Sequence, residues 1–185
     1  MIKCDSNWTC CQRQQAAAKV RAMNKELPKN IRADVTNLTD RKELCQKNAR
    51  NAMDKATPKE NARNARAVGA APCVVEALEN GETRSDLGLE MDHPLDVKLG
   101  GAPDGVPLIP LDGTINGFFG GVAKNAGNEM RDKNDKKKCE SVSLICPPSK
   151  KGCPPPGDPD GHSHNAGPRR AYPDPPGWVT PKRAA

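Results

Sequence analysis

A single histidine stands between two aspartates near the middle of the chain. The stretch MDHPLDVKLGGAPDG, residues 91–105, places His93 directly after Asp92 and three residues before Asp96, and no other histidine occurs in the first 161 residues. Histidine can act as a general base because the pKa of its imidazole lies near neutrality. Such a base acts best on water when a divalent metal ion stabilises the leaving oxygen. These residue types therefore indicate metal-assisted hydrolysis.

Hard oxygen donors are the ligands that such a metal ion prefers. Asp92 offers a carboxylate, and Asn116 offers an amide oxygen at the expected start of a helix. In the middle of a strand, Asp92 and His93 would point to opposite faces, but a strand end or a bulge can direct both to one site. Structural roles compete with this interpretation, because His93 beside Pro94 suits a turn and Asp96 can cap a turn or a helix.

Composition describes a small protein with a modest core. The 185 residues are 35% hydrophobic and only 3% aromatic, so Leu, Val, Ile and Ala must fill the interior. The length suggests one domain with tails. No apolar run approaches the roughly 18 residues that cross a bilayer, so we expect no membrane span. The N-terminal segment lacks the apolar region of a secretory signal, so we expect no signal peptide.

The cysteines leave two redox states open. No CxxC pair occurs and no histidine lies near the early cysteines, which argues against a structural zinc site. An even number permits a disulfide framework, whereas the missing signal peptide makes free thiols equally acceptable. Export by a route other than general secretion would reconcile bridges with the missing signal. Cys73 is the best candidate for an alternative site, in which a thiol nucleophile pairs with His93. The eight cysteines are at positions 4, 10, 11, 45, 73, 139, 146 and 153.

Charge is distributed unevenly along the chain. Residues 12–67 hold 14 Lys and Arg against 6 Asp and Glu, residues 68–112 hold 2 against 9, and residues 113–153 hold 8 against 4. The acidic middle can hold a divalent cation, and the basic flanks can attract a polyanion. Solvated helix surfaces would give the same pattern, so charge alone does not decide between these interpretations.

Helices and short extended segments must position these residues. Good helix formers fill the stretch before Pro28, and the residue before a proline avoids the helical region. Thr57-Pro58-Lys59-Glu60 combines a capping box with proline at the first helical position. Short apolar runs between glycines and prolines indicate strands. We predict helices over residues 7–26, 40–54, 58–68, 73–80 and 114–132, and strands or extended segments over residues 95–101, 106–112 and 140–146.

The stretch DHPLDVKLGG, followed by VPLIPLDGTINGFFGG, resembles the core of the His-Me finger (HNH-type) nucleases. That family pattern is Asp-His, a short apolar stretch, a Gly-Gly turn, an apolar strand, and a helix that carries an Asn or His metal ligand. The chain is more similar still to bacterial polymorphic-toxin DNases, in which an HxxD motif precedes a Leu-Gly-Gly turn. Here the motif is His93-Pro94-Leu95-Asp96 and the turn is Leu99-Gly100-Gly101, and the similarity covers about residues 90–125.

The resemblance implies a mainly helical α+β domain with a small ββα core that clasps one metal ion. His93 would activate the water, Asp92 and Asn116 would hold the metal ion, and Asp96 would orient His93 or support the metal. The ion would be Mg²⁺, with Mn²⁺ and Zn²⁺ as alternatives. The chain departs from the HNH pattern near residues 104–106, where the Asn that fixes the histidine is replaced by Asp104 as the nearest polar candidate, and it has no zinc-knuckle cysteines around the helix.

The resemblance also implies a biological setting. Such DNases are C-terminal toxin domains of effectors, often delivered by type VI secretion, which act in the cytoplasm of a target bacterium. A cognate immunity protein neutralises them, and the basic flanks predict that this partner is acidic. Lys98 and Lys124, together with the basic helices in residues 12–67, would hold the DNA backbone without reading bases.

Three parts are therefore expected in the chain. Residues 1–80 would form a helical N-terminal part, residues 81–146 the ββα nuclease core, and residues 147–185 an irregular Pro-rich tail. An RNase toxin on the same scaffold is one alternative function. A non-enzymatic scaffold or adaptor that binds partners through the Pro-rich tail is another.

Overall fold

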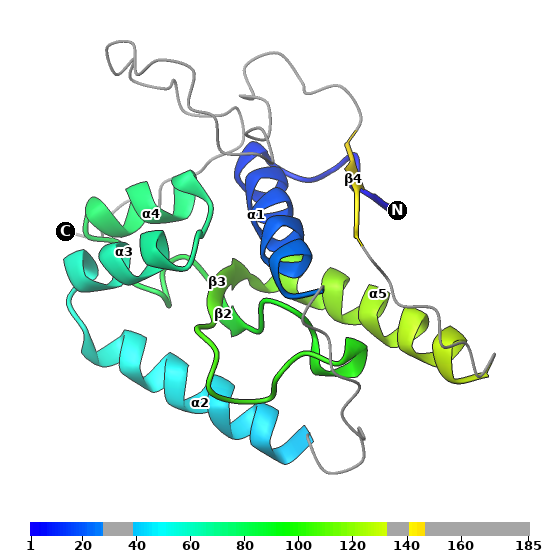
Figure 1. Cartoon of the computed structure of the whole chain (residues 1–185). Helices are drawn as coiled ribbons and strands as arrows, with labels where there is room; N and C mark the ends of the chain where they lie inside the picture. Colours follow the sequence, from blue (N-terminus) through cyan, green and yellow to red (C-terminus); the bar gives the residue numbers. More distant parts are fainter. Residues whose placement is uncertain (28–38, 133–140, 147–185) are drawn as a thin grey trace.

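The computed structural model describes residues 1–27, 39–132 and 141–146 of the chain (Figure 1). The Pro-rich tail predicted over residues 147–185 lies outside these ranges. The described residues form a mainly helical α+β fold with two small two-stranded sheets, which confirms the mainly helical α+β part of the predicted fold class. Within them, every helix is too short or too polar to cross a bilayer.

Five α-helices lie within the described residues, close to the predicted segments. They are α1 (Cys10–Glu26), α2 (Thr39–Lys55), α3 (Pro58–Ala67), α4 (Pro72–Glu79) and α5 (Gly113–Asp132). One 3₁₀ helix and four short strands accompany them, namely η3 (Val97–Leu99), β1 (Ile2–Lys3), β2 (Leu89–Asp92), β3 (Ile109–Asp112) and β4 (Leu144–Ile145). Strand β1 pairs in parallel with β4, and β2 pairs antiparallel with β3.

Capping boxes begin two of the helices. The side chain of Thr57 accepts a hydrogen bond from the backbone of Glu60, whose carboxylate accepts one from the Thr57 N–H (2.8 Å), so the predicted start of α3 is confirmed. Thr9 and Gln12 form the same arrangement at α1. This second box explains why α1 begins directly after Thr9 rather than at residue 7, because the cap residue itself is not helical.

The segment predicted as a strand over residues 95–101 is instead a capped turn, so that prediction is wrong. The Asp96 carboxylate accepts a hydrogen bond from the backbone N–H two residues later (2.8 Å), which begins η3. Gly100 ends η3 with φ at 94°, and a Cβ on Gly101 would lie 1.9 Å from the Leu95 carbonyl oxygen. Both positions of the Gly-Gly turn therefore need glycine. The first strand of the hairpin is β2, which ends at Asp92, before the segment 95–101 begins.

The β2–β3 hairpin lies at the centre of the fold. Helices α1, α2 and α5 all contact it, while α3 packs on α4 (Figure 1). Strand β3 runs directly into α5, because Asp112 ends the strand and Gly113 begins the helix. Leu111 of β3 and Ile115 of α5 are 0% exposed. The strand-to-helix junction is therefore part of the core.

Disulfides fasten the N-terminal segment to later elements. The Cys4–Cys146 bond lies beside the β1–β4 pair, and the Cys11–Cys73 bond joins α1 to α4. Cys10 is also disulfide-bonded. The sequence left bridges and free thiols open, and the structure has bridges at all three of these N-terminal cysteines.

Removing the Cys11–Cys73 bond is expected to lower the free energy of unfolding by about 2–4 kcal/mol, because the bond closes a long loop in the unfolded chain. Its cysteines are 62 residues apart. Urea denaturation of the double variant Cys11→Ala/Cys73→Ala measures this loss. The matched control is Cys45→Ala, which removes the free, half-buried thiol, and a loss no larger than in this control would contradict the prediction.

Candidate active site at the end of strand β2

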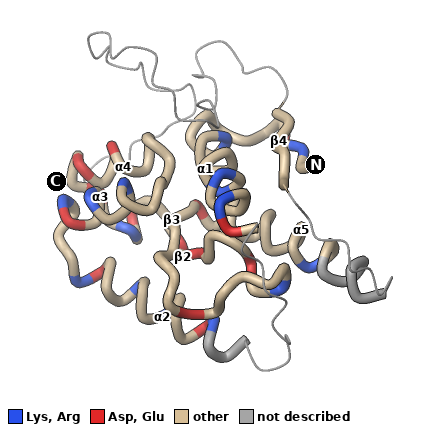
Figure 2. Tube along the Cα trace, viewed as in Figure 1, with Lys and Arg blue, Asp and Glu red and all other residues tan. Residues whose placement is uncertain are grey.

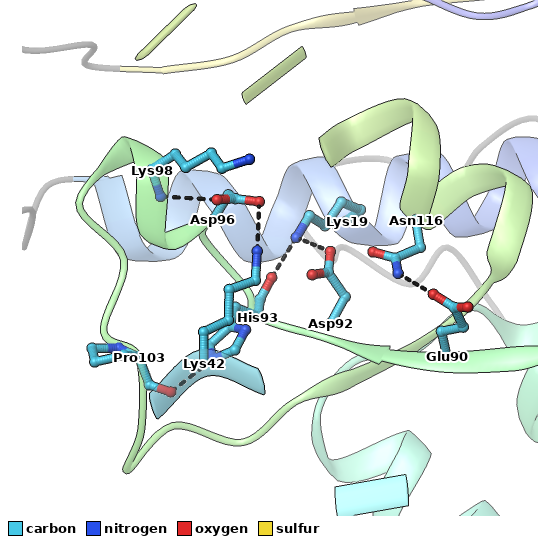
Figure 3. Close-up of polar contacts among 9 residues, drawn as sticks. All are labelled: Lys19, Lys42, Glu90, Asp92, His93, Asp96, Lys98, Pro103 and Asn116. Carbon is cyan, nitrogen blue, oxygen red and sulfur yellow. Dashed lines mark hydrogen bonds and ion pairs between the residues drawn. The ribbon is translucent and has the colours of Figure 1, made fainter. Parts of the chain in front are cut away.

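The end of β2 carries the predicted catalytic residues into the protein interior. Strand β2 ends at Asp92 and His93 follows it directly, so both residues lie at the strand end, where adjacent side chains need not point to opposite faces. His93 is 0% exposed, Asp92 4% and Asp96 6%. Figure 3 shows these three residues with their polar contacts. Polar side chains buried to this degree require hydrogen-bond partners.

The imidazole of His93 is held by the backbone carbonyl of Pro103. Its Nε2 lies 2.9 Å from the Pro103 oxygen. Since a carbonyl can only accept, Nε2 carries the proton and donates. The other nitrogen, Nδ1, is buried and has no hydrogen-bond partner among the described residues. The neutral ring therefore keeps its lone pair on Nδ1. A polar side chain near residues 104–106 was the expected partner of the His93 ring, and the backbone carbonyl of Pro103 is its partner in the structure.

The surroundings of His93 favour its neutral form. Burial lowers the pKa of His93 below the usual 6.5 and is the largest effect. The hydrogen bond to Pro103 and the charge of Asp92 oppose this shift, while the charges of Lys42 and Lys19 add to it. The ring is therefore in its basic form at neutral pH.

Acidification from pH 7 to pH 5 is expected to destabilise the folded protein through His93. Because the folded pKa lies below 6.5, the unfolded chain binds this proton before the folded state does as the pH falls. The stabilisation is fully present above about pH 6.5 and is lost as the pH falls toward the folded pKa. Urea unfolding across this range, compared with His93→Gln, isolates the contribution. Equal pH dependence in both proteins would contradict it.

Lys19 of α1 is the partner of Asp92. Its Nζ lies 2.6 Å from Asp92 Oδ2, and it also donates a hydrogen bond to the His93 carbonyl oxygen (Figure 3). The two side chains are 2% and 5% exposed, so this is a buried ion pair. This ion pair could not be predicted from the sequence, because Lys19 is one of 29 Lys and Arg residues and lies 73 positions before Asp92.

Asp96 has two partners of its own. Its Oδ1 caps η3, and its Oδ2 lies 3.1 Å from the Nζ of Lys42 in the first turn of α2. The ring of His93 has its hydrogen bond to Pro103, so Asp96 does not orient the ring by a direct hydrogen bond here. The capping role that the sequence left open for Asp96 is present.

Asn116 lies in the first turn of α5 and contacts Glu90, which the sequence pattern does not mark as a site residue. Its amide Nδ2 donates to Oε2 of Glu90 at 2.5 Å (Figure 3). Glu90 precedes Asp92 by two positions on β2, so their side chains leave the same face of the strand. The strand and the helix thereby place two carboxylates and one amide on one side of the hairpin.

The donors near the end of β2 are oxygen atoms, which are the ligand type that Mg²⁺ prefers. Across the described ranges, no three His, Cys, Asp or Glu side chains are grouped so as to hold a metal ion. Zinc sites usually need such a group. Mg²⁺ is commonly held by one or two carboxylates, with water and substrate phosphate completing the shell. Asp92 and Asn116, with Glu90 beside them, fit that requirement in donor chemistry, and Lys19 already occupies one oxygen of Asp92.

Some of the basic residues are exposed, whereas Lys19 is buried and Lys42 is half-buried. Lys98 and Lys124, the predicted DNA-contacting residues, are both exposed. Figure 2 shows Lys and Arg along α1, α2 and α3, with acidic residues on β2 among them. Lys19 and Lys42 turn inward and pair with acids. Some of the positive charge of the N-terminal helices therefore pairs with acidic side chains and is not fully exposed to solvent.

One cavity within the described residues lies away from His93, which is not part of its wall. It has a volume of about 140 Å³ between α1, α4 and the hairpin, and its wall includes the Cys11–Cys73 bond and Asp112. The alternative of a Cys73 nucleophile is incompatible with this structure, because the Cys73 sulfur is bonded to Cys11. His93 has no exposed surface, so a substrate reaches Nδ1 only after a covering side chain moves.

Comparison of the chain with protein-family models, with curated proteins and with solved structures found no match. The interpretation of the site therefore depends on its residues and their geometry.

Proposed function

We propose that this chain is a metal-dependent nuclease of the antibacterial toxin class, with His93 as the general base in DNA hydrolysis. The observation that carries the proposal is the state of the imidazole. Its Nε2 donates to the Pro103 carbonyl, and its Nδ1 has no hydrogen-bond partner within the part of the chain that the structure describes. Burial also lowers the pKa of His93. A general base needs a nitrogen lone pair that no hydrogen bond uses and a neutral resting state, and these two features support the role for His93 once Nδ1 is uncovered.

The order of elements supports a His-Me finger arrangement. Strands β2 and β3 form an antiparallel pair and α5 follows without a break. His93 comes directly after the first strand, and Asn116 lies in the first turn of the helix. A ββα nuclease needs its base and its metal ligand in these two places.

The proposed reaction begins with transfer of a proton from water to Nδ1 of His93. The water oxygen attacks phosphorus, and the 3′ oxygen of the scissile bond leaves. Asp92 and Asn116 would hold a Mg²⁺-like ion, which when bound stabilises charge on the leaving oxygen. Lys98 and Lys124 would hold the phosphate backbone without reading bases.

Access to His93 requires a side chain to move, and Lys42 is the candidate. Its charge acts on His93, and its side chain is 20% exposed in the pair with Asp96. An approaching phosphate would attract the ammonium of Lys42 away from Asp96. Substrate binding would then uncover the ring.

The disulfides support the proposal of a secreted effector. Structural disulfides are typical of proteins that leave the reducing cytoplasm. We propose delivery by a secretion system, type VI being the best candidate, and action in the cytoplasm of a target bacterium. An acidic immunity protein would then block the site in the producing cell, and its co-purification tests this part.

The direct test of the function is incubation with plasmid DNA and Mg²⁺ or Mn²⁺, with and without a chelator. We expect cleavage that needs the metal ion and weakens as salt rises, because phosphate contacts release counterions. Structured RNA in parallel reactions separates a DNase from an RNase. A folded protein that leaves both substrates intact with every metal ion would refute the nuclease and favour the adaptor.

The tautomer of His93 is a second measurable expectation. Nitrogen-detected NMR of the imidazole at neutral pH should show a proton on Nε2 and none on Nδ1, because the Pro103 carbonyl accepts from Nε2. Replacing His162 and His164 with Gln leaves His93 as the only histidine and makes the assignment direct. A proton on Nδ1 would remove the lone pair that the mechanism uses.

A further inference from the structure

The Lys19 ammonium is a buried charge that the proposed reaction does not use. Lys19 is 1% exposed. Figure 3 shows its ammonium between the Asp92 carboxylate and the His93 carbonyl, with hydrogen bonds to both. One cation therefore binds the predicted metal ligand and the backbone of the proposed base.

Helix α1 holds this ammonium in place. Cys11, Gln15 and Lys19 are spaced four residues apart and so lie on one face of the helix. Cys11 is bonded to α4, and the Gln15 side-chain oxygen accepts a hydrogen bond from the Asp112 N–H at 2.5 Å. The helix face that delivers the ammonium to the strand end is thus fixed at two further points.

Asp92 cannot serve two cations equally. The Lys19 ammonium lies 2.6 Å from Oδ2 of Asp92. At this distance the ammonium donates a charge-assisted hydrogen bond to that oxygen. A divalent ion on the same carboxylate would lie close to a positive charge in a site shielded from water, where repulsion is strong. Binding of the ion therefore requires the ammonium to move.

Resting on the nuclease function above, we propose that Lys19 is a resident cation that competes with the divalent metal ion for Asp92. In the metal-free protein the ammonium neutralises the carboxylate. When the ion binds, the ammonium leaves Oδ2. Because the ammonium must be displaced, the protein binds the divalent ion more weakly than the same oxygen donors would bind it without the Lys19 charge.

Calorimetric titration with Mn²⁺ alone tests this competition. Lys19→Gln keeps hydrogen-bond donors for Asp92 and the His93 carbonyl but removes the charge. It should bind Mn²⁺ roughly tenfold more tightly than the wild type, or better. Lys25→Gln removes an exposed charge from the same helix and should change the affinity less than about twofold. Adding Asp92→Asn to Lys19→Gln should abolish the gain.

Equal Mn²⁺ affinity in the wild type and Lys19→Gln, including no binding in either, overturns the proposal. A measurement on the wild type covers the case in which the variants do not fold. Nitrogen NMR should detect the Lys19 ammonium as a slowly exchanging signal, and titration with Mg²⁺ should remove its protection from exchange. A signal that stays unchanged while the protein saturates with Mg²⁺ also overturns it.

Different results would refute the nuclease function and the competition between Lys19 and the metal ion. If Lys19→Gln gains affinity while wild-type protein cleaves neither DNA nor RNA, the nuclease is refuted and the competition stands. If wild-type protein cleaves DNA and Lys19→Gln shows no gain in affinity, the nuclease stands and the competition is refuted.

Discussion

Replacing His93 with glutamine is expected to reduce metal-dependent DNA cleavage by about 10²–10⁴-fold, which is the usual contribution of a general base. The substitution is chosen from the geometry of the ring. A glutamine amide can place a donor near the position of Nε2 and keep the hydrogen bond to the Pro103 carbonyl. It offers no basic lone pair where Nδ1 now lies. The loss would therefore report the missing base rather than a collapsed loop.

Two comparisons make this result decisive. His93→Ala should lose as much activity as His93→Gln but should also lose stability, because it leaves a cavity where a side chain is 0% exposed. His162→Gln makes the same chemical change at a histidine that the proposed mechanism does not use and should leave the rate unchanged. The rate of plasmid cleavage under single-turnover conditions is the measurement. If folded His93→Gln retains more than about a tenth of the wild-type rate, His93 is not the base.

The helices could be predicted from the sequence because their signals are local. The Thr57 capping box and Pro58 fix the start of α3 within four residues of chain. The start of α1 depends on the same kind of signal, because Thr9 and Gln12 also form a capping box. This capping box places the first residue of α1 at Cys10 rather than at residue 7. The prediction of a strand at residues 95–101 is wrong because it rests on a short apolar run among glycines and prolines, whereas the Asp96 cap and the Gly-Gly pair determine the backbone.

Only those features of the candidate site that depend on neighbouring residues could be predicted from the sequence. Asp92 and His93 are neighbours in the chain, so their shared position at a strand end could be foreseen. Asn116 lies in the first turn of α5, as expected. The partner of the His93 ring could not be foreseen, because a backbone carbonyl such as that of Pro103 leaves no mark on residue types. Glu90 was missed because nothing in its neighbours distinguishes it from other surface acids.

The charge pattern has a physical explanation that the sequence did not reveal. The basic N-terminal helices and the acidic middle were interpreted either as a polyanion-binding surface with a cation site or as solvated faces. In the structure, Lys19 and Lys42 from the basic region pair with Asp92 and Asp96 from the acidic region. Such pairing depends on contacts across 73 and 54 positions of the chain, and composition carries no information about register at that range.

Replacing Asp92 with asparagine is expected to lower the free energy of unfolding by about 3–5 kcal/mol, because it leaves the Lys19 ammonium buried without its counter-ion. The pair is almost inaccessible to water, with side-chain exposures of 2% and 5%. Urea denaturation at neutral pH measures the loss. Glu90→Gln is the matched control, because it makes the same carboxylate-to-amide change two residues away on β2 at an exposed position, and it should change stability by less than about 0.5 kcal/mol.

The joint replacement Lys19→Met/Asp92→Leu separates the stability of this pair from its use. Exchanging a buried ion pair for apolar side chains is often neutral, so the double variant should recover most of the stability that either single change loses. A double variant as unstable as the sum of its single variants would show that the two charges do not interact. If stability returns while Mn²⁺ binding and DNA cleavage do not, the pair serves the site rather than the fold. That outcome would explain why a small core contains two charges that aliphatic side chains could replace.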